Sequence, residues 1–244
     1  MDVKKTVLVT RPEPGASATA KRLAAMGFAP IVLPLTEIVA LTPPEPIVSH
    51  LYQAVVVTSV NALRHMERGT IEGLLEKPVF AVGASTADAA RGAGFEDVRI
   101  GAGTARDLAA LITLTTEPSV HILHLAGTDR TPGFEDAIIA SGRHMTILET
   151  YAAERISYPT DFIVERLNGA PVDHALVFST RASQLLAEIV MRDALRECFE
   201  TTAFLCISGQ AARPLADYAG DRIVVSNQPT ENGVMLLLSA DGRA

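Results

Sequence analysis

The chain has 244 residues, of which 48% are hydrophobic and only 5% aromatic, so Ala, Leu, Val and Ile must fill the cores of one large or two small domains. Its net charge of −7 and its lack of any basic run argue against a nucleic-acid partner. No segment approaches the roughly 20 apolar residues of a membrane helix, and the first residues lack a secretion-signal pattern, so we expect a cytoplasmic protein that does not bind membranes.

Strands and helices are predicted to alternate along the first half of the chain. Apolar, β-branched runs predict the strands, and apolar residues at helical spacing predict the helices. Segment 51–67 holds a strand that runs directly into a helix, which Ser59 or Asn61 is placed to cap. The other predicted strands cover 6–10, 30–35, 78–83 and 98–100, and the other helices cover 16–26, 86–93 and 104–113.

Gly27 is predicted to end its helix in a left-handed conformation, and Thr104 with Asp107 resembles a capping box. The prolines at 43, 44 and 46 break the chain and indicate a linker or domain edge. These local signals support the predicted boundaries.

The second half of the chain repeats this order. Strands are predicted over 120–125, 145–151, 175–178, 203–207 and 222–225, and helices over 134–141, 161–168, 211–219 and 229–239, with one more after Thr180. Thr58-Ser59 and Ser179-Thr180 are hydroxyl pairs that each follow an apolar strand and precede a helix. The repeat predicts an α/β fold of two similar three-layer domains with parallel sheets, with a cleft between facing strand ends.

Several kinds of site are not expected. Cys198 and Cys206 fit neither a CxxC pair nor a usual zinc site, and we expect both to be reduced. The six histidines form no metal-ligand pattern, and the fingerprints of dinucleotide-binding, P-loop and hydrolase-elbow sites are missing.

Seven stretches, in this order and spacing, resemble the uroporphyrinogen-III synthase family. They are residues 7–12, 30–38, 57–62, 79–86, 125–130, 148–151 and 229–233. The resemblance implies two flavodoxin-like α/β domains joined by a two-stranded linker. Domain 1 would be residues 1–35 plus 157–244, domain 2 would be 42–147, and the linkers would be 36–41 and 148–156.

The resemblance also implies a reaction. Members of the family cyclise the linear tetrapyrrole hydroxymethylbilane, which carries eight carboxylates, to uroporphyrinogen III with loss of water and inversion of ring D. They need no metal or organic cofactor. A monomer is expected, and the substrate would be handed over from the preceding deaminase. The alternative is a two-domain binding or regulatory module that closes on a small anionic ligand without catalysis.

Tyr151 and Thr86 are the candidate catalytic residues. Tyr151 matches the tyrosine that the family places on the second crossing, where a phenol is able to donate a proton to the leaving hydroxide. The other interpretation is a tyrosine that only packs the hinge. Thr86 follows a strand end and would bond a substrate carboxylate or the leaving water, or would simply cap a helix.

The candidate substrate-binding residues lie at strand ends, where helix N-termini offer free amides and partial positive charge to a polyanion. Hydroxyl groups and arginines beside these turns would add hydrogen bonds, although a solvated or linker-bonded role for the arginines, and local backbone bonding by the hydroxyls, stay open. Where the first half has Gly83 and Thr86, the second half has Ser208 and Ala211, and this weakens the case for a hydroxyl contact there. The predicted set is Thr10, Arg11, Thr58, Ser59, Gly83, Ser85, Gly127, Arg130, Ser179, Thr180 and Ser208.

Overall fold

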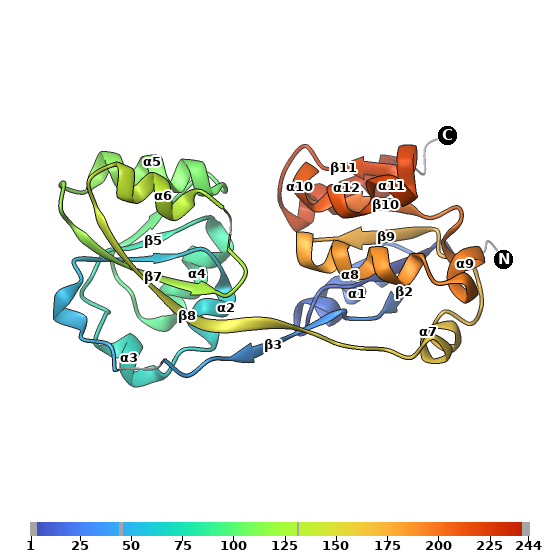
Figure 1. The fold of residues 1–244 in the computed structure, drawn as a ribbon, viewed down its shortest axis with the longest axis horizontal. Helices are drawn as coiled ribbons and strands as arrows, with labels where there is room; N and C mark the ends of the chain where they lie inside the picture. Colours follow the sequence, from blue (N-terminus) through green and yellow to red (C-terminus); the bar gives the residue numbers. More distant parts are fainter. Residues whose placement is uncertain (1–3, 44–45, 131, 241–244) are drawn as a thin grey trace. The chain divides into compact units, whose positions relative to one another are not determined.

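The computed structural model describes residues 4–43, 46–130 and 132–240, and Pro44 of the predicted proline break lies outside them. The chain forms two compact units (Figure 1). Unit 1 comprises Met1–Glu37 and Glu154–Ala244, and unit 2 comprises Ile38–Ala153. The chain therefore passes between the units twice.

Unit 1 contains a five-stranded sheet in the order β11-β10-β9-β1-β2, and every pairing in it is parallel. Its strands are β1 (Thr6–Val9), β2 (Ala29–Val32), β9 (His174–Val177), β10 (Ala203–Cys206) and β11 (Ile223–Val225). Numbered within the unit, this is the 2-1-3-4-5 order of flavodoxin-like folds. The strand order changes direction between β1 and β9, which places a topological switch point at their carboxyl ends.

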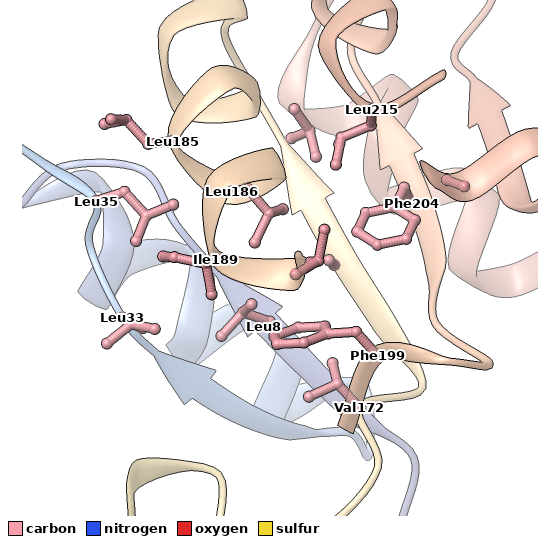
Figure 2. Packing of buried hydrophobic residues seen from close by; sticks show 14 of the residues in the cluster. Leu8, Leu33, Leu35, Val172, Leu185, Leu186, Ile189, Phe199, Phe204 and Leu215 are labelled. Carbon is pink, nitrogen blue, oxygen red and sulfur yellow. The ribbon is translucent and has the colours of Figure 1, made fainter. Parts of the chain in front are cut away.

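Helices cover both faces of the unit 1 sheet because its strands are apolar on both sides. Along β1, Val7 and Val9 pack in one cluster with Leu23 and Val234, while Leu8 packs in the other. In that second cluster, Leu8 and Phe199 meet Leu186 between the sheet and α8 (Figure 2). The helices of unit 1 are α1 (Gly15–Ala25), α7 (Thr160–Arg166), α8 (Thr180–Val190), α9 (Arg196–Phe199), α10 (Gly209–Ala212), α11 (Ala216–Ala219) and α12 (Glu231–Ala240).

The second sheet has six strands in the order β3-β8-β7-β4-β5-β6. The five from β8 to β6 pair in parallel. Their bounds are β3 (Thr36–Ala40), β4 (Ala54–Val57), β5 (Val79–Ala81), β6 (Val98–Ile100), β7 (His121–Gly127) and β8 (His144–Arg155). The order β8-β7-β4-β5-β6 repeats the arrangement of unit 1 with a circularly shifted chain order, so the switch point of unit 2 lies between β7 and β4.

Two cores also sandwich the unit 2 sheet. Val55 and Val57 pack toward α2, α3 and α4, whereas Ala54 and Val56 pack toward α5 and α6. These helix layers lie on opposite sides of the sheet (Figure 1). Their bounds are α2 (Val60–Arg64), α3 (Arg68–Glu72), α4 (Ala84–Ala93), α5 (Ala105–Thr115) and α6 (Phe134–Ala140). The predicted α/β class with two three-layer, parallel-sheet domains is confirmed.

Strand β3 runs antiparallel to β8. The Leu41 N–H donates to the Thr150 carbonyl at 2.9 Å, and the Ile156 N–H donates to the Leu35 carbonyl at 3.0 Å. Residue numbers therefore rise along one segment as they fall along the other. Both passages of the chain between the units, at Glu37–Ile38 and at Ala153–Glu154, occur in these two strands.

The predicted helix caps are confirmed. Ser59 accepts from the Asn61 N–H at 3.2 Å, and Thr104 accepts from the Asp107 N–H at 3.2 Å. Gly27 has φ +93°, the left-handed conformation that favours glycine.

Two helix predictions are wrong in their extent. The helix predicted over 211–219 is α10 and α11 separated by a 3₁₀ turn at Arg213–Leu215, because Pro214 has no N–H to continue an α-helix. The helix predicted to reach Glu67 ends at Arg64, and the extended backbone of Glu67 begins the unpredicted α3. Within the described residues, no helix is both long and apolar enough to span a membrane.

Candidate functional site

The carboxyl ends of β4, β5 and β7 form an edge of unit 2 where predicted site residues gather. We call Thr58, Ser59, Gly83 and Gly127 at these ends the unit 2 rim. β4 and β7 are neighbours in the sheet and flank its switch point. Open α/β sheets bind ligands at such an edge because helix N-termini and loops converge there.

Tyr151 lies against Gly127 at this rim. The two residues are register partners in β8 and β7, at an irregularity in the pairing. A Cβ atom on residue 127 would lie 2.5 Å from Tyr151 Cζ and 2.9 Å from its hydroxyl oxygen. Only glycine leaves room for the phenol here, so the missing side chain at 127 places the Tyr151 ring over the end of β7.

The Tyr151 phenol is kept protonated by its surroundings. Burial raises its pKa above the usual value of 10.0, a hydrogen bond with Ser59 opposes the rise, and the Asp129 carboxylate adds to it. The neutral phenol is thus available at neutral pH as a hydrogen-bond and proton donor beside Ser59.

Thr58, His124 and Glu135 form a row beneath the same rim. Thr58 Oγ1 lies 3.2 Å from His124 Nε2, and His124 Nδ1 lies 3.5 Å from Glu135 Oε1. The His124 side chain is 2% exposed, and burial, with the nearby Arg130 charge, lowers its pKa to about 4. The imidazole is therefore neutral at neutral pH.

Arg130 is engaged by carboxylates of its own unit. Its Nε lies 3.3 Å from Glu135 Oε1, its Nη1 pairs with Glu149, and the same nitrogen donates to the Gly127 carbonyl at 3.2 Å. A substrate carboxylate at Arg130 would have to share the guanidinium with these acidic residues.

Strand β5 leads into α4 at the same edge of the sheet. Gly83 is the N-cap residue of α4, and no side chain caps the first turn. Ser85 is exposed there, while Thr86 is buried as the third residue of the helix. The interpretation of Thr86 as a helix cap is therefore wrong, and the amides at the start of α4 are left for a ligand or water.

The corresponding edge of unit 1 carries Thr10, Ser179 and Ser208, the unit 1 rim. The fully buried Thr10 donates to the Leu176 carbonyl at 3.1 Å. Ser179 accepts from the Ala182 N–H at 3.1 Å, and Ser208 accepts from the Ala211 N–H at 3.2 Å, each capping a helix. Thr180 follows as the first residue of α8, partly buried. The local backbone bonding that the sequence left open is thus present at all three residues of this rim.

Arg11 is held inside unit 1. Its guanidinium pairs with Glu231 at 2.9 Å, donates to Thr19 at 3.3 Å and stacks 4.8 Å from the centre of the Phe178 ring. Arg11 therefore bonds residues of its own unit and no linker residue, while its side chain stays 30% exposed. The partner lies 220 positions along the chain and was invisible to sequence analysis.

Nothing in residues 4–43, 46–130 or 132–240 groups His, Cys, Asp and Glu as a metal site would require. Cys198 and Cys206 are both free and buried. Burial raises the pKa of the Cys206 thiol to about 12, so this cysteine is unreactive in the folded protein.

A family model described as uroporphyrinogen-III synthase HemD matches residues 17–235. The chain belongs to the uroporphyrinogen-III synthase family. Two solved structures share its fold. A uroporphyrinogen-III synthetase from Helicobacter pylori has a TM-score of 0.66 at 14% identity, covering 98% of this chain and 99% of that one. A mutant uroporphyrinogen III synthase from the thermophilic bacterium Thermus thermophilus has a TM-score of 0.61 at 17% identity, covering 98% of each chain. No curated protein sequence gives a significant match.

In this member of the uroporphyrinogen-III synthase family, unit 2 brings together residues that are far apart in sequence. Thr58, Ser59, Gly127 and Tyr151 gather around the ends of β4 and β7, with Arg130 bonded to Gly127. Gly83, Ser85 and Thr86 lie at the next strand end. Thr10, Ser179, Thr180 and Ser208 form a second set in unit 1.

Sequence analysis missed His124 and Glu135. His124 interrupts the apolar run of β7 between the buried Leu123 and Leu125 and points to the opposite face from them. A histidine inside a buried strand was the available signal, but its partners Thr58 and Glu135 come from other elements. Only the fold brings the three together.

Proposed function

We infer that this chain cyclises hydroxymethylbilane to uroporphyrinogen III, with loss of water and inversion of ring D. The observation that carries this conclusion is the family match over residues 17–235. The α/β fold of two parallel sheets agrees with it. A module that binds an anion without catalysis is not favoured.

We propose that Tyr151 donates a proton or hydrogen bond to the departing hydroxide. Hydroxide is a poor leaving group, so a positioned acid lowers the barrier to its loss. The proposal is supported by the neutral phenol at the unit 2 rim, held by Gly127 and Ser59. We further propose that Thr86, beside the free amides of α4, assists binding of a carboxylate or of the departing water.

We propose that the substrate carboxylates bind at the strand ends of both sheets. A serine that accepts from a backbone N–H keeps its own O–H for a carboxylate, which applies to Ser179 and Ser208, whereas the hydroxyl of Ser59 also bonds Tyr151. Uncapped amides after Gly83 and the partial positive charge of α4 would serve the same purpose. The proposed substrate-binding set also includes the following residues, none of which is assigned to a carboxylate in particular: Thr10, Arg11, Thr58, Ser59, Ser85, Gly127, Arg130 and Thr180.

We also propose a route of substrate delivery, a cellular compartment, an oligomeric state and domain bounds for this chain. Hydroxymethylbilane closes spontaneously to the wrong isomer, which favours direct handover from the preceding deaminase. We propose a cytoplasmic monomer with linkers at 36–41 and 148–156, and domains at 1–35 plus 157–244 and at 42–147. The two buried free cysteines agree with a reducing compartment.

A coupled assay tests the activity. Hydroxymethylbilane is generated in place, the full chain is added, and the type I and type III uroporphyrins are separated after oxidation. A dominant type III product is expected. If folded protein yields only type I, the ring has closed without help, and the synthase function is rejected in favour of the binding module.

Variants then test the roles of Tyr151 and Thr86. Tyr151→Phe keeps the ring and removes the proton, so a loss of about tenfold or more in the type III rate is expected of a donor. Thr86→Val keeps the buried shape and removes the hydroxyl. Thr113→Val is the matched control, since Thr113 donates only to the Ala109 carbonyl of its own helix. Wild-type rates in Tyr151→Phe would reject the phenol as the acid.

A further inference from the structure

We propose that Thr58 receives a hydrogen bond from an N–H or O–H donor of the substrate and does not bind a carboxylate. The inference rests on the proposed function, and it assigns Thr58 a different task from Ser179 and Ser208. It follows from the direction of one hydrogen bond, that between Thr58 and His124.

Two neighbours face the His124 ring from opposite sides. Thr58 Oγ1 lies 3.2 Å from Nε2, and Glu135 Oε1 lies 3.5 Å from Nδ1. Among the described residues, neither His124 Nδ1 nor Glu135 Oε1, both buried, has a hydrogen-bond partner. Where the single proton of the neutral ring sits decides whether Thr58 donates or accepts.

Glu135 decides in favour of Nδ1. Its Oε1 also lies 3.3 Å from Arg130 Nε, an ion-pair contact in which the carboxylate oxygen is the acceptor. A proton on Nδ1 is attracted by this oxygen. The other tautomer would direct two lone pairs at each other across 3.5 Å in a buried space, which is costly at low dielectric.

The consequence is that Nε2 carries a lone pair and accepts the Thr58 O–H. A threonine hydroxyl has one donor and two acceptor lone pairs, so Thr58 presents only acceptor capacity to a ligand. Thr58 itself is partly exposed at the rim. Ser179 and Ser208 have the opposite arrangement, because each accepts from a backbone N–H and keeps a donor.

The substrate offers two donors that match Thr58. Each pyrrole ring carries an N–H, and the terminal hydroxymethyl group carries an O–H. Carboxylates have only lone pairs and would be repelled by the Thr58 oxygen. We therefore expect Thr58 to accept a hydrogen bond from a pyrrole N–H or from the hydroxymethyl O–H of the substrate. Hydroxyls that keep a donor would bind the substrate carboxylates.

The first test measures the direction of the bond in the full chain without ligand. The ¹⁵N chemical shifts of the His124 ring distinguish a protonated nitrogen from one with a lone pair. We expect a proton on Nδ1 and a lone pair on Nε2 at neutral pH. A proton on Nε2 would free the Thr58 O–H and overturn the proposal, whether or not the chain is a synthase.

The second test measures the contact itself in the type III assay. Thr58→Val removes the acceptor and is expected to lower kcat/KM about fivefold to tenfold, the effect of one neutral hydrogen bond, whereas Thr58→Ser keeps the rate. Thr146→Val is the matched control. Thr146 makes the same kind of bond to His121 Nε2, at 2.9 Å, near the amino ends of β7 and β8.

A competitor identifies the donor. A linear tetrapyrrole that lacks the hydroxymethyl oxygen is measured as an inhibitor of the wild type and of Thr58→Val. Equal weakening of competitor and substrate by Thr58→Val assigns the pyrrole N–H, and weakening of substrate alone assigns the hydroxymethyl O–H. Unchanged kcat/KM in folded Thr58→Val overturns the contact, while type III formation by the wild type separately upholds the proposed function.

Discussion

At the scale of single residues, the unit 2 rim depends on one missing side chain and one buried ring. Gly127 leaves the space that Tyr151 fills, and His124 supports Thr58 from below. Neither Gly127 nor His124 needs to touch the substrate to matter. Gly127 determines where Tyr151 presents its phenol to the substrate. His124 determines that Thr58 presents a hydroxyl oxygen that accepts hydrogen bonds.

Gly127→Ala is expected to displace the Tyr151 ring, because the new Cβ would lie 2.5 Å from Cζ. The type III rate should fall about as far as in Tyr151→Phe, roughly tenfold or more. Since burial raises the Tyr151 pKa, an ultraviolet titration of the displaced phenol should show this pKa falling toward 10. The matched control is Gly92→Ala in α4, where nothing lies within 4 Å of the new atom. A wild-type rate and titration in Gly127→Ala would contradict this placement of Tyr151.

His124 should make the folded state sensitive to mild acid. Its pKa is about 4 when folded and about 6.5 when unfolded, so between these values the unfolded chain binds more protons. The free energy of unfolding therefore falls as pH drops through this window, by about 2 kcal/mol from this residue between pH 7 and pH 5.

Chemical denaturation at the two pH values measures this effect. His124→Phe should lose that part of the pH dependence, whatever its absolute stability. The exposed His144→Gln leaves His124 in place and should keep it. Equal pH dependence in wild type and His124→Phe would show that His124 is not held neutral by the fold.

At the scale of elements, the sequence predicted those features that depend on contacts between residues close together in the chain. Thr104 and Ser59 cap helices through contacts two or three residues away, so their roles followed from spacing. Arg143 is the opposite case. It is 5% exposed and bonds Thr113 and Thr116 at the end of α5, about 30 positions earlier. Arg143 lies in the turn between α6 and β8, and only the packing of α6 against α5 brings these groups together. The same limit hid His124 and Glu135.

Arg143→Met should destabilise unit 2 by about 2–4 kcal/mol, because the carbonyls of Thr113 and Thr116 at the C-terminus of α5 lose the charged donor of two partly buried hydrogen bonds. Arg143 donates to the carbonyl oxygens of Thr113 at 2.8 Å and Ser141 at 2.6 Å, and also to that of Thr116. Arg91→Met is the control, because its exposed pair with Asp88 contributes less than about 1 kcal/mol. Urea denaturation compares the two variants, and equal losses would contradict the role of Arg143.

At the scale of the whole molecule, the repeat seen in the sequence corresponds to two sheets with the same arrangement of strands. β2-β1-β9-β10-β11 and β8-β7-β4-β5-β6 have the same spatial order, and each sheet is covered by its own pair of cores. Which half each strand belongs to did not follow from periodicity, because the first strands return to pair with the C-terminal quarter. That assignment came from the family resemblance.

Because each unit has its own cores, we expect unit 2 to lose stability without opening unit 1. Both cysteines, Cys198 and Cys206, lie in unit 1 and are buried. Arg143 lies in unit 2. Modification by a thiol reagent under native conditions therefore reports opening of unit 1 alone. Arg143→Met should leave this labelling rate unchanged while lowering the denaturation midpoint of unit 2. Phe199→Ala removes a side chain from the core beside Cys198 and should raise the labelling rate. Faster labelling in Arg143→Met would mean that the two units unfold as one.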